Sequence, residues 1–135
     1  DALETALEAM RPHVTGRLVV VFGAGGDRDA GKRPLMGVVA DRSADLVIVT
    51  DDNPRREDAD TIRRQILVGC PRAQEIGDRA EAIAAAIGLL GPEDVLIVAG
   101  KGHEDGQIVG TQKLPFDDRD VARTAALEQG GEVAP

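Results

Sequence analysis

The chain has 135 residues, of which 42% are hydrophobic and 1% aromatic, and its formal net charge at pH 7 is −8. A chain of this length forms one domain that buries a core of its own, here built from Val, Ile, Leu and Ala. The acidic balance argues against nucleic acid as a partner, because a phosphate backbone requires a basic surface. The scarcity of aromatic residues also removes the platforms on which single strands stack.

No apolar run approaches membrane-spanning length, so we expect no membrane partner. The single cysteine, Cys70, cannot form an internal disulfide, which fits a reducing cytoplasm and an inert thiol. Residues 1–11 are acidic and helical in pattern, unlike a signal peptide. The chain begins in that pattern without a methionine, so we expect it to be a piece of a longer protein.

Helical and strand patterns alternate along the chain. Apolar spacing predicts a helix over 2–11 that Pro12 ends, and short apolar runs predict buried strands at 17–22, 45–50 and 94–99, with a weaker strand at 73–76. Further helices are expected at 34–42, 58–69, 78–91 and 117–129, with a hairpin of 107–109 and 112–114 and a tail at 130–135. The order predicts an α/β fold: a Rossmann-like, mainly parallel sheet flanked by helices, with a short C-terminal antiparallel hairpin, in one domain over 1–129.

Three unusual loops follow strands of this predicted sheet, at 23–32, 50–57 and 100–106. In a parallel sheet such loops emerge at one edge, the carboxyl ends of the strands, where ligands bind. Together they bring cationic side chains beside carboxylates: Arg28, Lys32, Arg55 and Lys101 beside Asp27, Asp52 and Glu104. This balance of signs favours a zwitterionic ligand over a bare polyphosphate.

The loop at 50–56 has the clearest chemistry. Pro54 restricts its own backbone and that of Asn53, which makes the loop stiff. Asp52 is suited to an ammonium group, and Arg55 to a carboxylate held through two parallel N–H bonds. The same residues also fit an ordinary solvated turn built on Asn-Pro.

The glycine-rich loop matches two nucleotide motifs incompletely. The run from Gly23 begins like a dinucleotide fingerprint, but Arg28 stands where the last glycine belongs. Gly26 begins a phosphate-loop pattern, but Arg33 stands where a Ser or Thr should hold magnesium. In the structural interpretation, Gly25 and Gly26 serve a flexible loop that tolerates positive φ. A stand-alone Rossmann-like nucleotide-binding or regulatory module and a non-catalytic interaction domain remain as alternative functions.

The histidines do not predict a metal or catalytic centre. His13 is expected in a surface loop, and His103 is interpreted as a structural or supporting residue at the loop edge. No His, Cys and carboxylate spacing typical of a metal site is present in the sequence.

Four ordered motifs resemble the C-terminal domain of the Mur ligases, namely Phe22-Gly-Ala-Gly-Gly-Asp-Arg-Asp29, Gly31-Lys-Arg-Pro-Leu-Met36, Asp52-Asn-Pro-Arg55 and Ala99-Gly-Lys-Gly-His-Glu104. The resemblance runs from residue 1 to about residue 127 and is strongest to the family branch that adds diaminopimelate in peptidoglycan synthesis. It implies a meso-diaminopimelate pocket formed by Arg28, Asp52, Asn53, Arg55, Gly100 and Glu104. In that pocket, Arg28 and Arg55 would hold the distal carboxylate, and Glu104 the distal ammonium.

The resemblance also implies what the chain lacks. Enzymes of this family carry an N-terminal domain for the UDP-N-acetylmuramoyl-dipeptide and a central domain for ATP and Mg²⁺. They form an acyl phosphate from ATP, which the incoming amine attacks. We therefore expect this chain to supply the amino-acid site, to contain no catalytic residue and no bound cofactor, and to be inactive and weakly binding alone.

Overall fold

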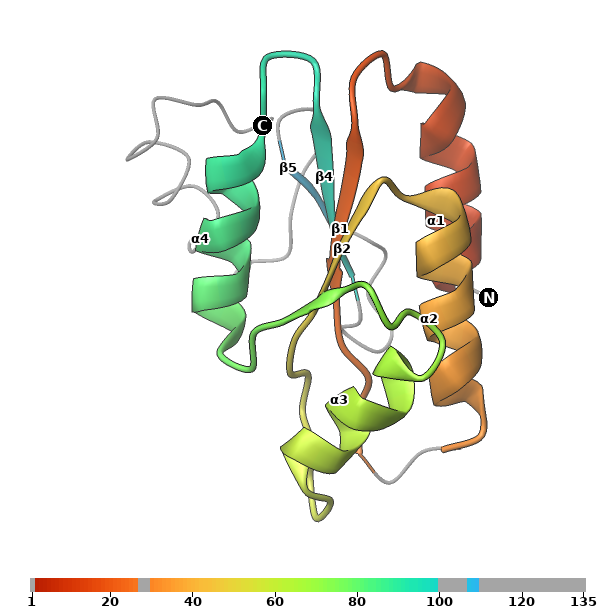
Figure 1. Cartoon of the computed structure of the whole chain (residues 1–135), viewed down its shortest axis with the longest axis vertical. Helices are drawn as coiled ribbons and strands as arrows, with labels where there is room; N and C mark the ends of the chain where they lie inside the picture. The colour runs from red at the N-terminus through yellow and green to blue at the C-terminus, as the bar shows by residue number, and fades with distance from the viewer. Residues whose placement is uncertain (1, 27–29, 100–106, 110–135) are drawn as a thin grey trace.

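The computed structural model describes residues 2–26, 30–99 and 107–109. In chain order the elements are α1 (Ala2–Met10), the 3-10 helix η1 (Arg11–His13), β1 (Leu18–Phe22), α2 (Lys32–Ser43), β2 (Leu46–Val49), α3 (Ala59–Leu67), β3 (Gln74–Glu75), α4 (Arg79–Leu89), β4 (Val95–Ala99) and β5 (Gln107–Val109) (Figure 1). No helix in these ranges combines the length and the hydropathy that a membrane crossing needs.

The strands form one sheet in the order β3-β2-β1-β4-β5. β1 pairs in parallel with β2 and β4, and β2 pairs in parallel with β3, whereas β5 runs antiparallel to β4. This arrangement confirms the predicted α/β fold with a mainly parallel sheet. The second arm of the expected hairpin, the helix at 117–129 and the tail lie outside the described residues.

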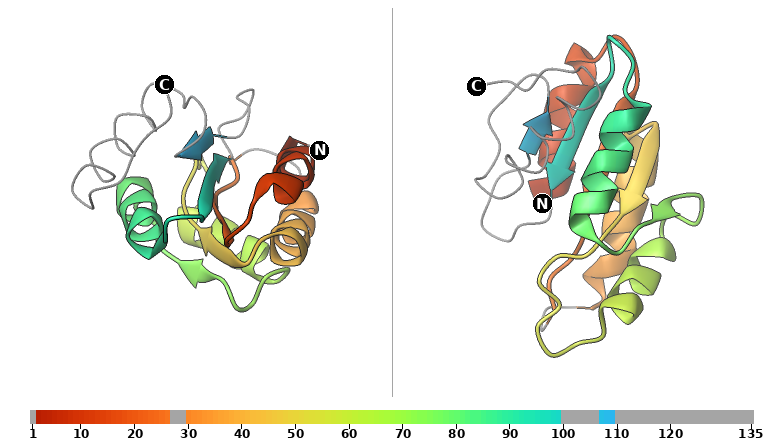
Figure 2. Two further views of the ribbon diagram at one scale, coloured as in Figure 1. Left: turned by 90° about the horizontal axis from the view of Figure 1, so that it is seen from above. Right: turned by 90° about the vertical axis from the view of Figure 1, so that its left-hand side faces the viewer.

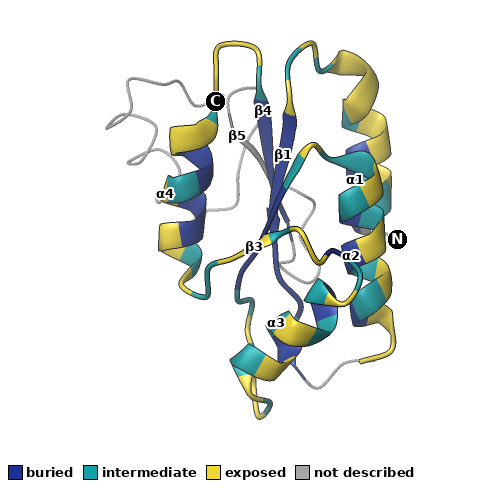
Figure 3. Ribbon diagram, viewed as in Figure 1, coloured by how far each residue is buried: buried dark blue, intermediate teal, exposed yellow. Residues whose placement is uncertain are grey.

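Helices cover both faces of the sheet, because side chains alternate along each strand. Val20 and Phe22 of β1 pack with α1, α2 and α3, whereas Val19 and Val21 pack with α4. Viewed from above, the red and orange helices α1 and α2 lie on one side of the sheet and the green α4 on the other (Figure 2). β1 and β4 are buried along their whole length (Figure 3), as their continuous apolar runs predict.

Two of the predicted helix starts, at Asp58 and Asp78, are confirmed by capping contacts, whereas α2 begins at Lys32, two residues before its predicted start. Asp58 Oδ2 accepts a hydrogen bond from Thr61 N at 3.1 Å, and Asp78 Oδ1 accepts one from Glu81 N at 2.9 Å. Each carboxylate satisfies one N–H group that the first helical turn leaves unpaired. The surface position expected for His13 is confirmed, but the residue ends the 3-10 helix η1 and does not lie in a loop.

The path of the chain through the sheet brings the carboxyl ends of three strands to one edge. The chain runs outward from β1 through β2 to β3 and then returns to β4 on the other side of β1. Phe22 aligns with Val49 in one pairing and with Ala99 in the other, so β1, β2 and β4 end level. The loops that follow them start at one edge. Between β1 and β4 the strand order reverses direction, and open α/β sheets bind ligands beside such a topological switch point.

The opposite edge of the sheet is joined by ion pairs. Asp94 accepts hydrogen bonds from Arg17 N at 2.7 Å and Gly91 N at 2.8 Å, and Arg17 Nη2 lies 2.9 Å from Asp94 Oδ2. Arg11 and Asp45 form a second pair, at 2.7 Å. These contacts bind the amino ends of the strands to the preceding loops, so we assign this edge a structural role.

Helices α2 and α3 pack with their backbones in close contact. A Cβ at Gly37 of α2 would lie 2.2 Å from the Ile66 carbonyl oxygen of α3. A Cβ at Gly69 would lie 2.0 Å from the Pro34 carbonyl oxygen. The two glycines therefore allow the first half of α2 and the C-terminal end of α3 to approach closely.

We predict that Gly37→Ala lowers the free energy of unfolding by about 1–3 kcal/mol, because a backbone oxygen cannot move aside as a flexible side chain does. This clash outweighs the gain of about 1 kcal/mol in helix propensity that alanine brings. Gly91→Ala is the control, since its nearest neighbour would be Asp94 Oδ2 at 3.4 Å. Urea unfolding measures both variants, and equal stability losses would contradict the role assigned to Gly37.

We predict that Asp94 contributes stability that is lost in acid. The N–H donors of Arg17 and Gly91 lower the pKa of Asp94 from 3.8 to about 2. Because the folded-state pKa is the lower one, the unfolded chain binds the proton more tightly. The stabilisation is therefore complete above about pH 4 and disappears as the pH falls through about 2.

The test compares the wild type with Asp94→Asn. Near neutral pH the variant should lose about 1–2 kcal/mol of unfolding free energy, because its amide nitrogen cannot accept the same hydrogen bonds. The difference between the two proteins should shrink between about pH 4 and pH 2. Chemical denaturation at a series of pH values measures it, and a difference independent of pH would refute the assignment.

Candidate functional site

The loop after β2 is anchored where the strand ends. Thr50 is buried, its N–H donates to the Phe22 carbonyl at 2.9 Å, and its Oγ1 donates to the Gly77 carbonyl at 3.0 Å. Gly23 passes so close that a Cβ there would lie 2.4 Å from the Thr50 carbonyl oxygen. The first residues after β1 and β2 are therefore held side by side.

The segment from Asp52 to Arg55 forms a tight turn built on its own side chains. Asn53 N donates to Asp52 Oδ1 at 2.9 Å, and Arg55 N donates to Asn53 Oδ1 at 3.3 Å. Arg55 has a φ of 53°, the left-handed conformation that residues other than glycine seldom adopt. Such backbone strain persists only where surrounding contacts impose it, and it concentrates at binding and catalytic sites.

These contacts come from the glycine-rich loop. Gly26 N donates to the Asn53 carbonyl at 2.8 Å, and Arg55 Nη1 donates to the Gly26 carbonyl at 2.8 Å. A Cβ at Gly26 would lie 1.7 Å from the Pro54 carbonyl oxygen. The expectation that Gly26 serves a flexible loop is wrong, because this position requires glycine for close contact between two backbones.

A buried arginine lies behind the two loops. Arg33 is 1% exposed, and its guanidinium donates to both carboxylate oxygens of Glu57, at 3.1 and 2.8 Å. It also donates to Gln65 Oε1 at 2.7 Å and to the Gly25 carbonyl at 3.1 Å. The hydrogen bond to Glu57 raises the pKa of Arg33 above its ordinary value, so the side chain remains charged.

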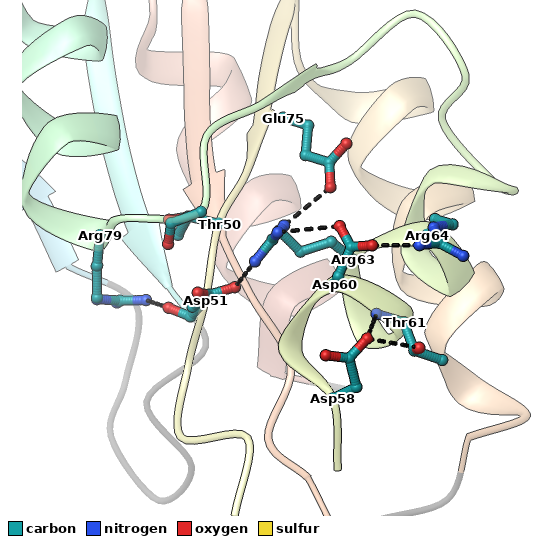
Figure 4. A network of polar contacts seen from close by, with 10 residues as sticks. Thr50, Asp51, Asp58, Asp60, Thr61, Arg63, Arg64, Glu75 and Arg79 are labelled. Atoms are coloured by element: carbon teal, nitrogen blue, oxygen red, sulfur yellow. Dashed lines mark hydrogen bonds and ion pairs between the residues drawn. The ribbon is translucent and has the colours of Figure 1, made fainter.

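A second network supports the base of the loop after β2 (Figure 4). Arg63 of α3 points toward three carboxylates, pairing with Glu75 at 2.8 Å, with Asp60 at 3.2 Å and with Asp51. The pKa of Arg63 is raised, first by Glu75 and then by Asp51. Asp51 is thus paired with Arg63. Asp52 is the next carboxylate along the loop after β2.

Arg79, at the start of α4, joins two strand ends. Its Nη1 donates to the Asp51 carbonyl and its Nη2 to the Ala99 carbonyl, both at 3.3 Å. The ends of β2 and β4 are therefore connected across β1, on the face opposite α2.

The structure brings together three of the predicted site residues. Asp52 is half-buried, and Asn53 and Arg55 are exposed, all in one turn at the carboxyl edge of the sheet. Arg28, Gly100 and Glu104 lie outside the described residues, as do Asp27, Lys101 and His103, so their part in the site stays a prediction.

The described residues do not complete a nucleotide or metal site of the kinds considered. Arg33, at the phosphate-loop position that needs a hydroxyl, is buried and engaged by Glu57, so no magnesium ligand can stand there. Among residues 2–26, 30–99 and 107–109, no group of three or more His, Cys, Asp or Glu is placed to hold a metal ion.

Comparison with known proteins decides the family. A family model described as the Mur ligase, glutamate ligase domain, matches residues 1–102. The chain belongs to the Mur ligase family. The resemblance read from its four motifs is thereby confirmed.

Curated relatives of this Mur ligase domain include two proteins named UDP-N-acetylmuramoyl-L-alanyl-D-glutamate–2,6-diaminopimelate ligase. That of Agrobacterium fabrum is 59% identical over 131 residues, covering 97% of this chain and 27% of the relative. That of Rhizobium meliloti is 62% identical over 125 residues, covering 93% and 26%. A solved structure of a ligase with the same name superposes with a TM-score of 0.79 at 39% identity, over 95% of this chain and 27% of that one. The chain thus spans about a quarter of the length of these relatives.

The residues that support the turn were not identified as such from the sequence. In the sequence, Arg33 stands out as part of the motif at 31–36 and as a departure from the phosphate-loop pattern, and no local pattern marks Arg63 or Arg79 as a supporting residue. In the structure the buried residues of α2 are Arg33, Gly37 and Ala40, at the helical spacing of a core-facing stripe, whereas the apolar Leu35 and Val38 are exposed. A charged residue on such a stripe indicates a buried polar network.

We predict that Gly26→Ala displaces the turn in this Mur ligase domain. The clash with the Pro54 carbonyl should cost about 1–3 kcal/mol of unfolding free energy and shift the backbone amide resonances of Asn53 and Arg55. Gly91→Ala is again the matched control. Heteronuclear NMR with urea unfolding provides the measurement, and unchanged resonances at both positions would show that the loops do not depend on this contact.

Proposed function

We propose that this chain is the C-terminal, amino-acid-binding domain of an ATP-dependent, cytoplasmic ligase that adds meso-diaminopimelate to UDP-N-acetylmuramoyl-L-alanyl-D-glutamate. The observation that carries the proposal is the turn from Asp52 to Arg55, strained at Arg55 and fixed against Gly26. It lies at the sheet edge where ligands of open α/β folds bind. The names of the relatives supply the substrate.

The chemistry of the turn fits one end of diaminopimelate, which carries an ammonium and a carboxylate on one carbon. A guanidinium presents five N–H donors in a plane, so Arg55 can bind a carboxylate while Nη1 stays on the Gly26 carbonyl. We assign Arg28 to the same carboxylate and Glu104 to the ammonium. Asp52, Asn53 and the backbone of Gly100 complete the proposed pocket within a domain over 1–129.

In this proposal, ATP is bound by the other domains of the enzyme and not by this chain. ATP with Mg²⁺ activates the carboxyl group of the UDP-linked dipeptide in such a ligase. The described residues do not fit that role, because Arg33 occupies the hydroxyl position of the phosphate-loop pattern. The task proposed for this chain is to bind diaminopimelate and orient its amine.

We predict that the chain can replace its counterpart in a complete ligase. In a chimera, this chain replaces the matching 131-residue segment of the Agrobacterium fabrum relative. Phosphate release with ATP and the UDP-linked dipeptide should depend on meso-diaminopimelate and should be at least about tenfold lower with lysine, which lacks the distal carboxylate. A folded chimera that uses lysine equally well, or neither amine, would contradict the proposal.

Substitution of Arg55 sharpens this test. Arg55→Lys in the chimera should raise the KM for diaminopimelate about 10- to 100-fold, because an ammonium cannot reproduce the two parallel hydrogen bonds. Arg64→Lys is the control, since Arg64 pairs only with its helical neighbour Asp60 among the contacts described and is exposed. Equal KM values in the two variants would remove Arg55 from the proposed pocket.

A further inference from the structure

The buried guanidinium of Arg33 is the point where four segments meet. Arg33 belongs to the first turn of α2, and its acceptors come from the glycine-rich loop, from the end of the loop after β2 and from α3. No other charged residue in the described part of the chain is buried to this degree. A charge taken out of water is retained only where partners compensate it.

The compensating groups belong mainly to the two loops that form the proposed pocket. Glu57 supplies a two-oxygen contact, and its own N–H donates to the Pro54 carbonyl at 3.0 Å, which closes the end of the turn. Gly25 supplies a carbonyl at 3.1 Å, one residue before the glycine that contacts Asn53. Arg33 therefore contacts each loop next to the position where the loops contact one another.

These contacts form a closed ring of hydrogen bonds and backbone. Arg33 donates to Gly25, the next residue Gly26 accepts from Arg55, and the chain continues from Arg55 to Glu57, which accepts from Arg33. A fork-shaped guanidinium fixes both distance and angle between its acceptors, which an ammonium on a flexible stem does not. The left-handed φ of Arg55 lies within this ring.

We propose that Arg33 is a positioning residue that fixes the turn from Asp52 to Arg55 against Gly25 and Gly26, and so sets the direction in which Arg55 presents its guanidinium. Arg33 itself does not contact the ligand. The identity of the ligand rests on the proposed function, whereas the effect on the loops does not.

A purely structural role for Arg33 makes a different prediction. If the ion pair with Glu57 only stabilises the core, its loss lowers global stability and leaves the local order of the turn and the affinity for diaminopimelate unchanged. The proposal instead requires a local effect that exceeds the global one.

The experiment uses the chimeric ligase with two substitutions of Arg33. Arg33→Lys keeps the charge and loses the fork, and Arg33→Met keeps the length and loses the charge. Glu57→Gln is a third variant that weakens the same contact from the other side. Arg17→Lys is the matched control, because Arg17 also donates to a carboxylate and a carbonyl, those of Asp94 and Leu89, but at the opposite edge of the sheet.

Two readouts separate the outcomes. Hydrogen exchange should accelerate in peptides covering 50–57 in both Arg33 variants and in Glu57→Gln, while exchange in peptides of β1 and β4 stays unchanged. In the Arg17→Lys protein, exchange at 50–57 should equal that of the unsubstituted chimera. The KM for diaminopimelate should rise about tenfold, the scale of one charge-assisted hydrogen bond, with kcat and the KM for ATP changing by less than about threefold. Arg33→Lys should be affected less than Arg33→Met.

Each result decides the question. Wild-type exchange at 50–57 and a wild-type KM in folded Arg33→Lys and Glu57→Gln would overturn the proposal, even if Arg33→Met fails to fold. If the unsubstituted chimera shows no reaction with diaminopimelate, the proposed function fails, and the exchange measurement alone decides the role of Arg33. Faster exchange with an unchanged KM would also overturn the claim that Arg33 directs Arg55.

Discussion

The level ends of the parallel strands are the constraint on which the rest of the site depends. Because β1, β2 and β4 stop in register, the loops that follow them begin at one edge without any long connection. The cationic side chains of Arg33 and Arg79 then approach this edge from opposite faces of the sheet, and each joins two of the segments that leave it. The sheet aligns the loops, and buried or half-buried guanidinium groups fix the distances between them.

Much of this fold could be predicted from the sequence, because its signals are local. Apolar runs of five or six residues identify strands covered on both faces, and Asp58 and Asp78 mark the helix starts that the structure confirms. The rule that parallel strands place their loops at one edge then predicts the location of the turn. The predicted ends of helices and strands are less accurate. The 3-10 helix η1 follows α1 where a loop is expected, because Pro12 can begin a 3-10 turn.

The internal support of the site could not be predicted in the same way, because it depends on contacts between residues far apart in sequence. The ion pair of Arg33 with Glu57 spans 24 positions, and the bond from Arg55 to Gly26 spans 29. The sequence shows a glycine at position 26, but it does not show that the Pro54 carbonyl lies where a Cβ of that residue would be. The apolar pattern of α2 also does not identify its buried face, because Leu35 and Val38 are exposed and Arg33 is buried with Gly37 and Ala40.

The left-handed backbone at Arg55 also restricts how this domain can diverge. Asparagine, aspartate, histidine and glycine adopt that conformation readily, whereas valine, isoleucine and threonine are strongly disfavoured there. A substitution at position 55 must therefore come from a short set of residues, unless the backbone of the turn is rebuilt as well. The choice of residue at position 55 is thus limited by conformational tolerance as well as by the contacts of its side chain.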